Sequence, residues 1–190
     1  MTAEDPQLKE CAAAFQANAN RVREIVDGFS GETFNWRANA GRWSVGECVE
    51  HLNATARAYM PEITKSISKA RAQNKTGAGP FKYGWLSRWF EGQLAPPPKR
   101  KFKAAKKSLP SASELDMAKV MQNFDSLQAE YLQKIVESDG LHLKKVKVKS
   151  PLAPLLRFEL GAAFQILAVH DSRHLWQMEQ VIKNPGFPKP

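Results

Sequence analysis

Three histidines in the chain stand at spacings that suit metal binding. His170 and His174 are four residues apart in an apolar, helix-forming stretch, so their imidazoles project from one helix face a single turn apart. Gln177 lies on the same face one turn further on. Two such imidazoles can bind one metal ion, and His51, from a second amphipathic stretch, can supply a third nitrogen. Three protein ligands leave coordination positions open, and a divalent ion there lowers the pKa of bound water towards neutrality. The pattern therefore indicates a catalytic rather than a structural metal site.

The same residues admit a simpler interpretation, because a histidine on an apolar helix face is often a hydrogen-bonded core residue. Glu47 is typical of a helix cap, and a carboxylate that orients a metal ligand is the alternative. Cys48 is expected to be a small core residue, with a fourth, sulfur ligand as the alternative. We expect Asp171 to point away from the histidine pair towards solvent, and His142 to be an exposed surface residue.

Four segments show the apolar spacing of three and four residues that marks amphipathic helices. They cover residues 6–29, 44–71, from 111 or 113 to 140, and from 151 or 154 to 183. The second helix opens with Ser44 and Glu47 in the order of a capping box. Residues 34–41 are expected to form a loop. The pattern predicts an all-α fold, an antiparallel four-helix bundle formed by a single domain over residues 1–190.

A long irregular connector, residues 73–110, separates the second and third helices. It is rich in glycine and proline, and its aromatic segment 83–90 predicts a short amphipathic helix that buries its aromatic side chains. A connection of this length is typical of a lid or a binding loop. Residues 141–150 alternate leucine or valine with lysine, which fits a strand, but a solvated basic connector is favoured because no second strand is evident.

Composition indicates a globular protein. Of 190 residues, 43% are hydrophobic and 25% charged, which excludes a wholly disordered chain. The N-terminus lacks the basic and apolar regions of a secretory signal, and no apolar stretch is long enough to span a membrane. Cys11 and Cys48 are too few for a disulfide framework and are expected to be buried thiols. We therefore expect a cytoplasmic protein with no membrane partner.

Positive charge is concentrated in two segments. The chain has 28 Lys and Arg against 19 Asp and Glu, a formal net charge of +9. Such basic clusters can attract nucleic acid, an anionic membrane surface or an acidic substrate. The sequence shows no zinc-finger spacing and no aromatic ribonucleoprotein motif, so solvated lysine-rich loops are the simplest interpretation. The clusters consist of Lys99, Arg100, Lys101, Lys103, Lys106 and Lys107, and of Lys144, Lys145, Lys147 and Lys149.

Two motifs resemble a known family. Asn35-Trp36 followed by Gly41-Arg-Trp-Ser-Val-Gly-Glu-Cys-Val-Glu-His-Leu52 is similar to the tryptophan, serine, glutamate and histidine motif of DinB-like proteins, the YfiT-type metalloenzymes. His170-Asp-Ser-Arg-His-Leu-Trp-Gln177 is similar to the HxxxHxxQ helix that closes that family's fold. The basic, proline-rich segment and the ending Asn184-Pro-Gly-Phe-Pro188 also match, so the likeness runs from about residue 7 to 188.

The resemblance implies a four-helix bundle in which His51, His170 and His174 hold a divalent metal. It also implies a homodimer, because family members often pair. Relatives include transferases and isomerases that use low-molecular-weight thiols. A matching set of ligands does not by itself imply a retained activity.

The first hypothesis is a metal-dependent enzyme that acts on a small, anionic substrate. His51, His170 and His174 would hold the metal, zinc or nickel, and Glu47 and Gln177 would position these ligands. The metal would activate water for hydrolysis, or a low-molecular-weight thiol for transfer to an electrophile, and the relatives favour the thiol. The residues expected at the mouth of the substrate site are Tyr83, Trp85, Trp89, Lys99, Arg100 and Lys101.

The second hypothesis is a non-enzymatic protein. The chain would be a metal-stabilised scaffold, or a stress protein that binds nucleic acid through its basic loops. In a third alternative the histidines pack together without metal and the site is a relict.

Overall fold

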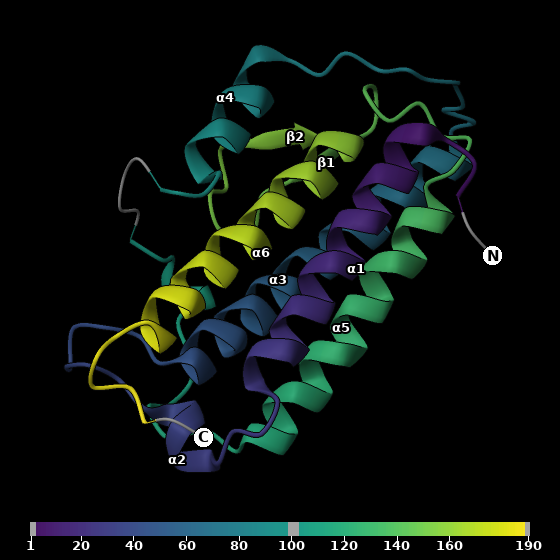
Figure 1. Cartoon of the computed structure of the whole chain (residues 1–190). Helices are drawn as coiled ribbons and strands as arrows, with labels where there is room; N and C mark the ends of the chain where they lie inside the picture. Colours follow the sequence, from purple (N-terminus) through teal and green to yellow (C-terminus); the bar gives the residue numbers. More distant parts are fainter. Residues whose placement is uncertain (1–2, 99–102, 189–190) are drawn as a thin grey trace.

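Four long helices form the body of the protein. The computed structural model describes residues 3–98 and 103–188. Its long helices are α1 (Pro6–Val26), α3 (Val45–Ala72), α5 (Met117–Glu137) and α6 (Leu160–Ile182). Because α1 and α3 each pack against both α5 and α6, the four helices surround a common core (Figure 1). The predicted all-α four-helix bundle is confirmed.

Neighbouring helices differ in their relative direction. Arg71, at the end of α3, donates to the backbone carbonyls of Glu137 and Asp139 at the end of α5, so these two helices run parallel. Arg21 and Glu179 likewise join the late parts of α1 and α6. The pairs α1 with α5 and α3 with α6 run antiparallel (Figure 1). The expected antiparallel arrangement thus holds for those pairs only, because the long connector returns the chain to the end of the bundle where α3 began.

The starts of the first helices follow local capping chemistry. The Ser44 hydroxyl accepts from the Glu47 amide at 3.0 Å, and the Ser44 amide donates to the Glu47 carboxylate at 2.8 Å, which confirms the predicted capping box. α1 ends three residues earlier than the predicted 29, at Val26. Part of the predicted loop 34–41 instead ends a short helix, α2 (Gly31–Asn35), whose first turn is capped by Ser30.

The later helices begin further along the chain than predicted. α5 starts at Met117 because the Asp116 carboxylate accepts from the Lys119 amide and caps the first turn. α6 starts at Leu160, not at residue 151 or 154, because the residues just before it are extended and form a strand. Periodicity alone does not separate such a strand from the first turn of the helix that follows.

The favoured interpretation of residues 141–150 as a solvated connector is wrong in part. Strand β1 (Lys147–Lys149) pairs antiparallel with β2 (Arg157–Glu159), and Val148 lies opposite Phe158. The lysines of β1 are exposed while Val148 is fully buried, as period-two alternation requires. Within 141–148 the buried side chains are those of Leu141, Leu143, Val146 and Val148.

The connector between α3 and α5 carries its own helix, α4 (Trp85–Leu94), which packs on α6. The predicted short helix is confirmed, but the burial of its aromatic residues holds only in part. Trp85 is 71% and Trp89 50% exposed, because positions 85, 88, 89 and 92 share the outward face of α4. Further on, the short 3₁₀ turn η1 (Lys106–Ser108) packs against α3.

Within residues 3–98 and 103–188, none of the helices combines the length and the apolar character needed to cross a bilayer. The two cysteines, Cys11 and Cys48, are buried free thiols, as expected.

Candidate metal centre

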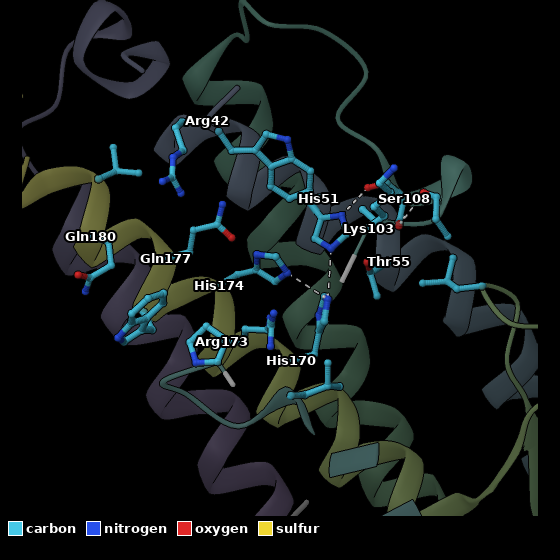
Figure 2. Close-up of a pocket in the computed structure, with 18 of the residues that line it drawn as sticks. Arg42, His51, Thr55, Lys103, Ser108, His170, Arg173, His174, Gln177 and Gln180 are labelled. Carbon is cyan, nitrogen blue, oxygen red and sulfur yellow. Dashed lines mark hydrogen bonds between the residues drawn. The ribbon is translucent and has the colours of Figure 1, made fainter. Parts of the chain in front are cut away.

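Two helices, α3 and α6, bring the side chains of the three predicted histidines together. His51 comes from α3, and His170 and His174 come from consecutive turns of α6. Nε2 of His170 lies 3.2 Å from Nε2 of His51 and 3.2 Å from Nε2 of His174 (Figure 2). One nitrogen from each ring lies within 4.8 Å of the other two. Among the described residues, this is the one cluster of three or more histidine, cysteine or acidic side chains that could hold a metal ion.

A backbone carbonyl orients His51. Nδ1 of His51 donates to the carbonyl of Ser108 in η1, across 57 residues of sequence. Because Nδ1 carries the proton, Nε2 presents its lone pair to the other two histidines. The Trp43 ring lies 4.9 Å from the His51 ring and stacks at 5.9 Å on the ring of His174, so it limits the rotation of both. Sequence reasoning missed Ser108, since any residue can supply a carbonyl.

The expectation that Asp171 points away from the histidines into solvent is wrong. Asp171 is 5% exposed, and one carboxylate oxygen accepts from the Gln128 side chain of α5 at 3.1 Å. Its other oxygen lies 3.9 Å from Nδ1 of His170. That Nδ1 is buried and has no hydrogen-bond partner among the described residues. A carboxylate in this place is typical of the groups that orient metal-ligating histidines.

Burial favours neutral imidazoles. Desolvation is the largest effect on the pKa of His51, and together with repulsion from His170 it lowers that pKa to about 4. The hydrogen bond to Ser108 acts in the opposite direction. Desolvation also lowers the pKa of His174 well below its ordinary value, with a smaller opposing effect of Gln177. His51 and His174 are therefore neutral at pH 7, which is the form that binds metal.

Two of the three nitrogen separations fit those expected around a divalent metal. A tetrahedral zinc ion with Zn–N bonds of about 2.0–2.1 Å holds two ligand nitrogens about 3.3 Å apart. The Nε2 separations of 3.2 Å from His170 match this spacing. Lone pairs that face one another at such a distance repel unless a proton or a cation lies between them. The donor set, imidazole nitrogen alone, is one that zinc and nickel accept.

The other polar residues considered near the site have structural roles. Glu47 caps α3 and also forms an ion pair with Arg37 at 3.3 Å, and no contact between Glu47 and a histidine ring is seen among the described residues. Cys48 is fully buried in the apolar core, and burial raises the pKa of its thiol. His142 is half-buried, not exposed, and its ring lies 4.8 Å from that of Phe81.

The histidine cluster lines a cavity of about 1120 Å³. Arg42, Lys103 and Arg173 lie in its wall, and no Asp or Glu occurs among the described residues that line it. Gln177 lines the cavity as well (Figure 2). Tryptophan, phenylalanine and leucine side chains supply an apolar lining, and these are Trp36, Trp43, Phe90, Leu94, Leu152, Leu167 and Trp176.

Three of the six residues expected at the mouth of the substrate site, Tyr83, Trp85 and Trp89, do not line the cavity. Tyr83 is buried with its hydroxyl against the backbone of Gly161, and Trp85 and Trp89 face outward from α4. None of these three lines the cavity, where the same segment instead contributes Phe90 and Leu94. The helical spacing of α4 could have predicted that Phe90 and Leu94 face the cavity, because positions 90 and 94 lie on the face opposite the tryptophans. Lys99, Arg100 and Lys101 lie outside the described residues.

Comparisons with known proteins agree with this architecture. The fold is similar to that of YfiT from Bacillus subtilis, which is described as a probable metal-dependent hydrolase with an unusual four-helix bundle topology. The TM-score is 0.59 at 12% sequence identity, over 95% of this chain and 89% of that one. No curated protein matches the sequence. The family model of the DinB superfamily matches residues 14–178. The resemblance seen in the two motifs is thus confirmed, and the chain belongs to the DinB superfamily.

Proposed function

We propose that this protein is a metal-dependent enzyme in which His51, His170 and His174 bind one divalent ion, zinc or nickel. The observation that carries the proposal is the convergence of three Nε2 atoms, from two buried rings and one half-buried ring in the wall of a large cavity. A metal held by three imidazoles acts as a Lewis acid and lowers the pKa of the water or thiol that it binds.

The surrounding residues prepare the ligands for this task. Ser108 fixes the tautomer and the direction of the His51 ring. Asp171 lies where it can accept a hydrogen bond from Nδ1 of His170 after a small movement, and Gln177 contacts His174. The protein therefore meets part of the cost of ordering the ligands when it folds, before the metal arrives.

The cavity favours a small anionic substrate, because its described lining contains cationic side chains and no acidic ones. The absence of acidic side chains from the described lining also affects which reaction is favoured. Hydrolysis needs a base that removes a proton from water, and zinc hydrolases often use a carboxylate for it. A bound metal lowers the pKa of either molecule, but a thiol starts from an unperturbed pKa of about 8.5 against 15.7 for water, so it depends less on a separate base. We therefore favour a transferase that uses a low-molecular-weight thiol over a hydrolase.

Metal content tests the ligand set. The untagged protein, purified without chelator and incubated with zinc or nickel, should contain close to one metal ion per chain by plasma mass spectrometry. His170→Ala should lose most of it, because two imidazoles bind a metal far more weakly than three. His142→Ala is the matched control, since His142 is the histidine outside the cluster, and it should keep its metal. A parent protein without metal would contradict the proposal.

Activity separates the two reactions. The zinc-loaded and nickel-loaded proteins are incubated with mercaptoacetate and a chromogenic aryl halide, and separately with a nitrophenyl ester in the absence of thiol. A transferase accelerates the first reaction and a hydrolase the second, and His51→Ala should abolish either one. Turnover of the ester alone would overturn the preference for the thiol reaction.

We also propose, from the family resemblance, that the chain pairs as a homodimer, and, from its low cysteine content, that it works in the cytoplasm. The alternative function is a non-enzymatic protein that binds nucleic acid through its basic segments. The exposed side chains of Lys144, Lys145, Lys147 and Lys149 support this alternative, which would require DNA binding that persists at physiological salt.

A further inference from the structure

A row of polar side chains continues from the histidine cluster along α3. His51, Thr55 and Tyr59 follow one another at intervals of four residues, so they share one face of the helix. All three line the same cavity. Thr55 is 3% and Tyr59 6% exposed. Figure 2 shows the Thr55 side chain on the cavity wall next to His51 and His170.

The hydroxyl of Thr55 lacks a hydrogen-bond partner. Threonine within a helix commonly donates to the carbonyl four residues earlier, which here belongs to His51. No such bond forms, and Oγ1 of Thr55 is buried without a partner among the described residues. A buried hydroxyl without a partner costs free energy, which a bound molecule recovers when it accepts that hydrogen bond.

One turn further on, a second hydroxyl donor remains unused. The hydroxyls of Tyr59 and Ser150 lie 2.8 Å apart, and Ser150 also accepts from the Ala153 amide. The pair has two O–H groups and one mutual hydrogen bond, so one O–H is left over whichever residue donates. No acceptor for it is found in the described part of the chain. Both residues line the cavity, so the remaining donor lies on its wall.

The charged side chains around the cavity also determine which kind of ligand it can bind. Arg42, Lys103 and Arg173 line it, and Arg173 already donates to the carbonyl of Gln93. No Asp or Glu occurs among the described residues that line the cavity. Spare donors and positive charge without side-chain acids call for a ligand that brings acceptor oxygens and negative charge. A carboxylate meets both needs.

We infer that Thr55 and the Tyr59–Ser150 pair form a subsite beside the histidine cluster that binds the carboxylate of an aryl or alkyl carboxylic acid. Thr55 donates to a carboxylate oxygen, and the apolar body of the molecule packs against side chains such as Phe90 and Leu94. The inference rests on the proposed function in one respect, namely that this cavity holds the substrate. The subsite itself is made by protein groups and requires no metal.

The test is equilibrium binding of benzoate, measured by isothermal titration calorimetry on both the metal-free and the zinc-loaded full-length chain. Thr55→Val keeps the shape of the side chain and removes the hydroxyl, and Thr55→Ser keeps the hydroxyl. A hydrogen bond to a charged group stabilises by about 1.5–3 kcal/mol, so Thr55→Val should weaken benzoate binding at least about tenfold. Thr55→Ser should bind within about threefold of the parent. Thr64→Val, on α3 but outside this cavity, is the matched control and should bind benzoate like the parent.

Three results would overturn the subsite: benzoate that does not bind the parent chain, benzoate that binds Thr55→Val as tightly as the parent, or benzamide that binds as tightly as benzoate. Circular dichroism melting of each variant establishes that it is folded, and recovery in Thr55→Ser separates the hydroxyl from packing. Metal counting separates the two proposals. If the parent holds no metal and yet binds benzoate through Thr55, the metalloenzyme proposal fails and the subsite stands. If Thr55→Val keeps its metal and its benzoate affinity, the subsite fails alone.

Discussion

At the scale of single residues, the histidine rings depend on partners that lie behind them. His51 has a carbonyl behind its Nδ1, whereas His170 has the carboxylate of Asp171 at 3.9 Å. The 3.9 Å gap is longer than a hydrogen bond. A metal on Nε2 would leave Nδ1 of His170 as a hydrogen-bond donor, and a small movement would bring the Asp171 carboxylate close enough to accept that bond. Gln128 holds that carboxylate from the other side.

Replacement of Asp171 by Asn should weaken metal binding without unfolding the chain. Asn can still accept from Gln128 and removes only the negative charge near His170. Loss of a carboxylate behind a ligating histidine typically lowers metal affinity 10- to 100-fold, and we expect a loss of that size in competition with a fluorescent zinc chelator. Asp125→Asn, which removes only an exposed ion pair with Arg23, serves as the control. Equal zinc affinity of Asp171→Asn and the parent would show that Asp171 is only a packing residue.

At the scale of elements, Glu159 joins three parts of the fold. It ends β2 directly before α6, accepts from the Ser87 hydroxyl of α4, and pairs with Lys147 of β1 at 2.9 Å. Burial by itself raises the pKa of this carboxyl, but the hydrogen bonds from Ser87 and Lys147 outweigh that effect and lower the pKa to about 2. The ionised form of Glu159 therefore stabilises the packing of α4 on α6, and with it one wall of the cavity.

The stability supplied by Glu159 should depend on pH. A carboxyl whose pKa is lower in the folded state stabilises the fold above its unfolded pKa of about 4.5, and this contribution is lost as the pH falls towards 2. Urea unfolding should show Glu159→Gln less stable than the parent at pH 6, with the difference shrinking at pH 4 and again at pH 3. Lys147→Gln should reproduce part of the loss at pH 6. A difference that stays constant from pH 6 to pH 3 would contradict this assignment.

At the scale of the whole molecule, the chain has a net charge of +9, and four of its lysines lie exposed on β1 and on the turn before it. Lys144, Lys145 and Lys149 are exposed, and none forms an ion pair among the described residues. Such a surface attracts polyanions by counterion release, without sequence preference. Weak DNA binding in dilute buffer would therefore follow from charge alone, whichever function the cavity serves.

We expect DNA binding to be non-specific and to fall steeply between 50 and 200 mM salt. Each phosphate contact contributes about 0.9 to the slope of log affinity against log salt, so the triple change of Lys144, Lys145 and Lys149 to Gln should reduce that slope by up to about 3. Fluorescence anisotropy with labelled duplex DNA measures it, and metal content should be the same in both proteins. Tight binding at 200 mM salt that prefers one sequence would instead favour the nucleic-acid alternative.

Local patterns of sequence were enough to predict the four long helices and the shared face of His170 and His174. Apolar spacing identifies an amphipathic helix because each helical turn is formed by residues close together in sequence. The Ser44–Glu47 capping box is likewise complete within four residues. The spacing of His170 and His174 likewise places both rings on one face of α6. The likeness of two ordered motifs to DinB-like proteins predicted the family and the bundle.

Tertiary structure alone decided which groups support the histidines. Asp171 meets Gln128 because α5 packs beside α6, and Ser108 meets His51 because η1 packs on α3. Strand β1 exists because β2 lies next to it. Hydrogen bonds between elements depend on which elements become neighbours and in which direction they run, and here the long connector makes α3 and α5 parallel. Sequence periodicity reports which face of a helix is apolar, and it carries no information about the residue that will lie opposite.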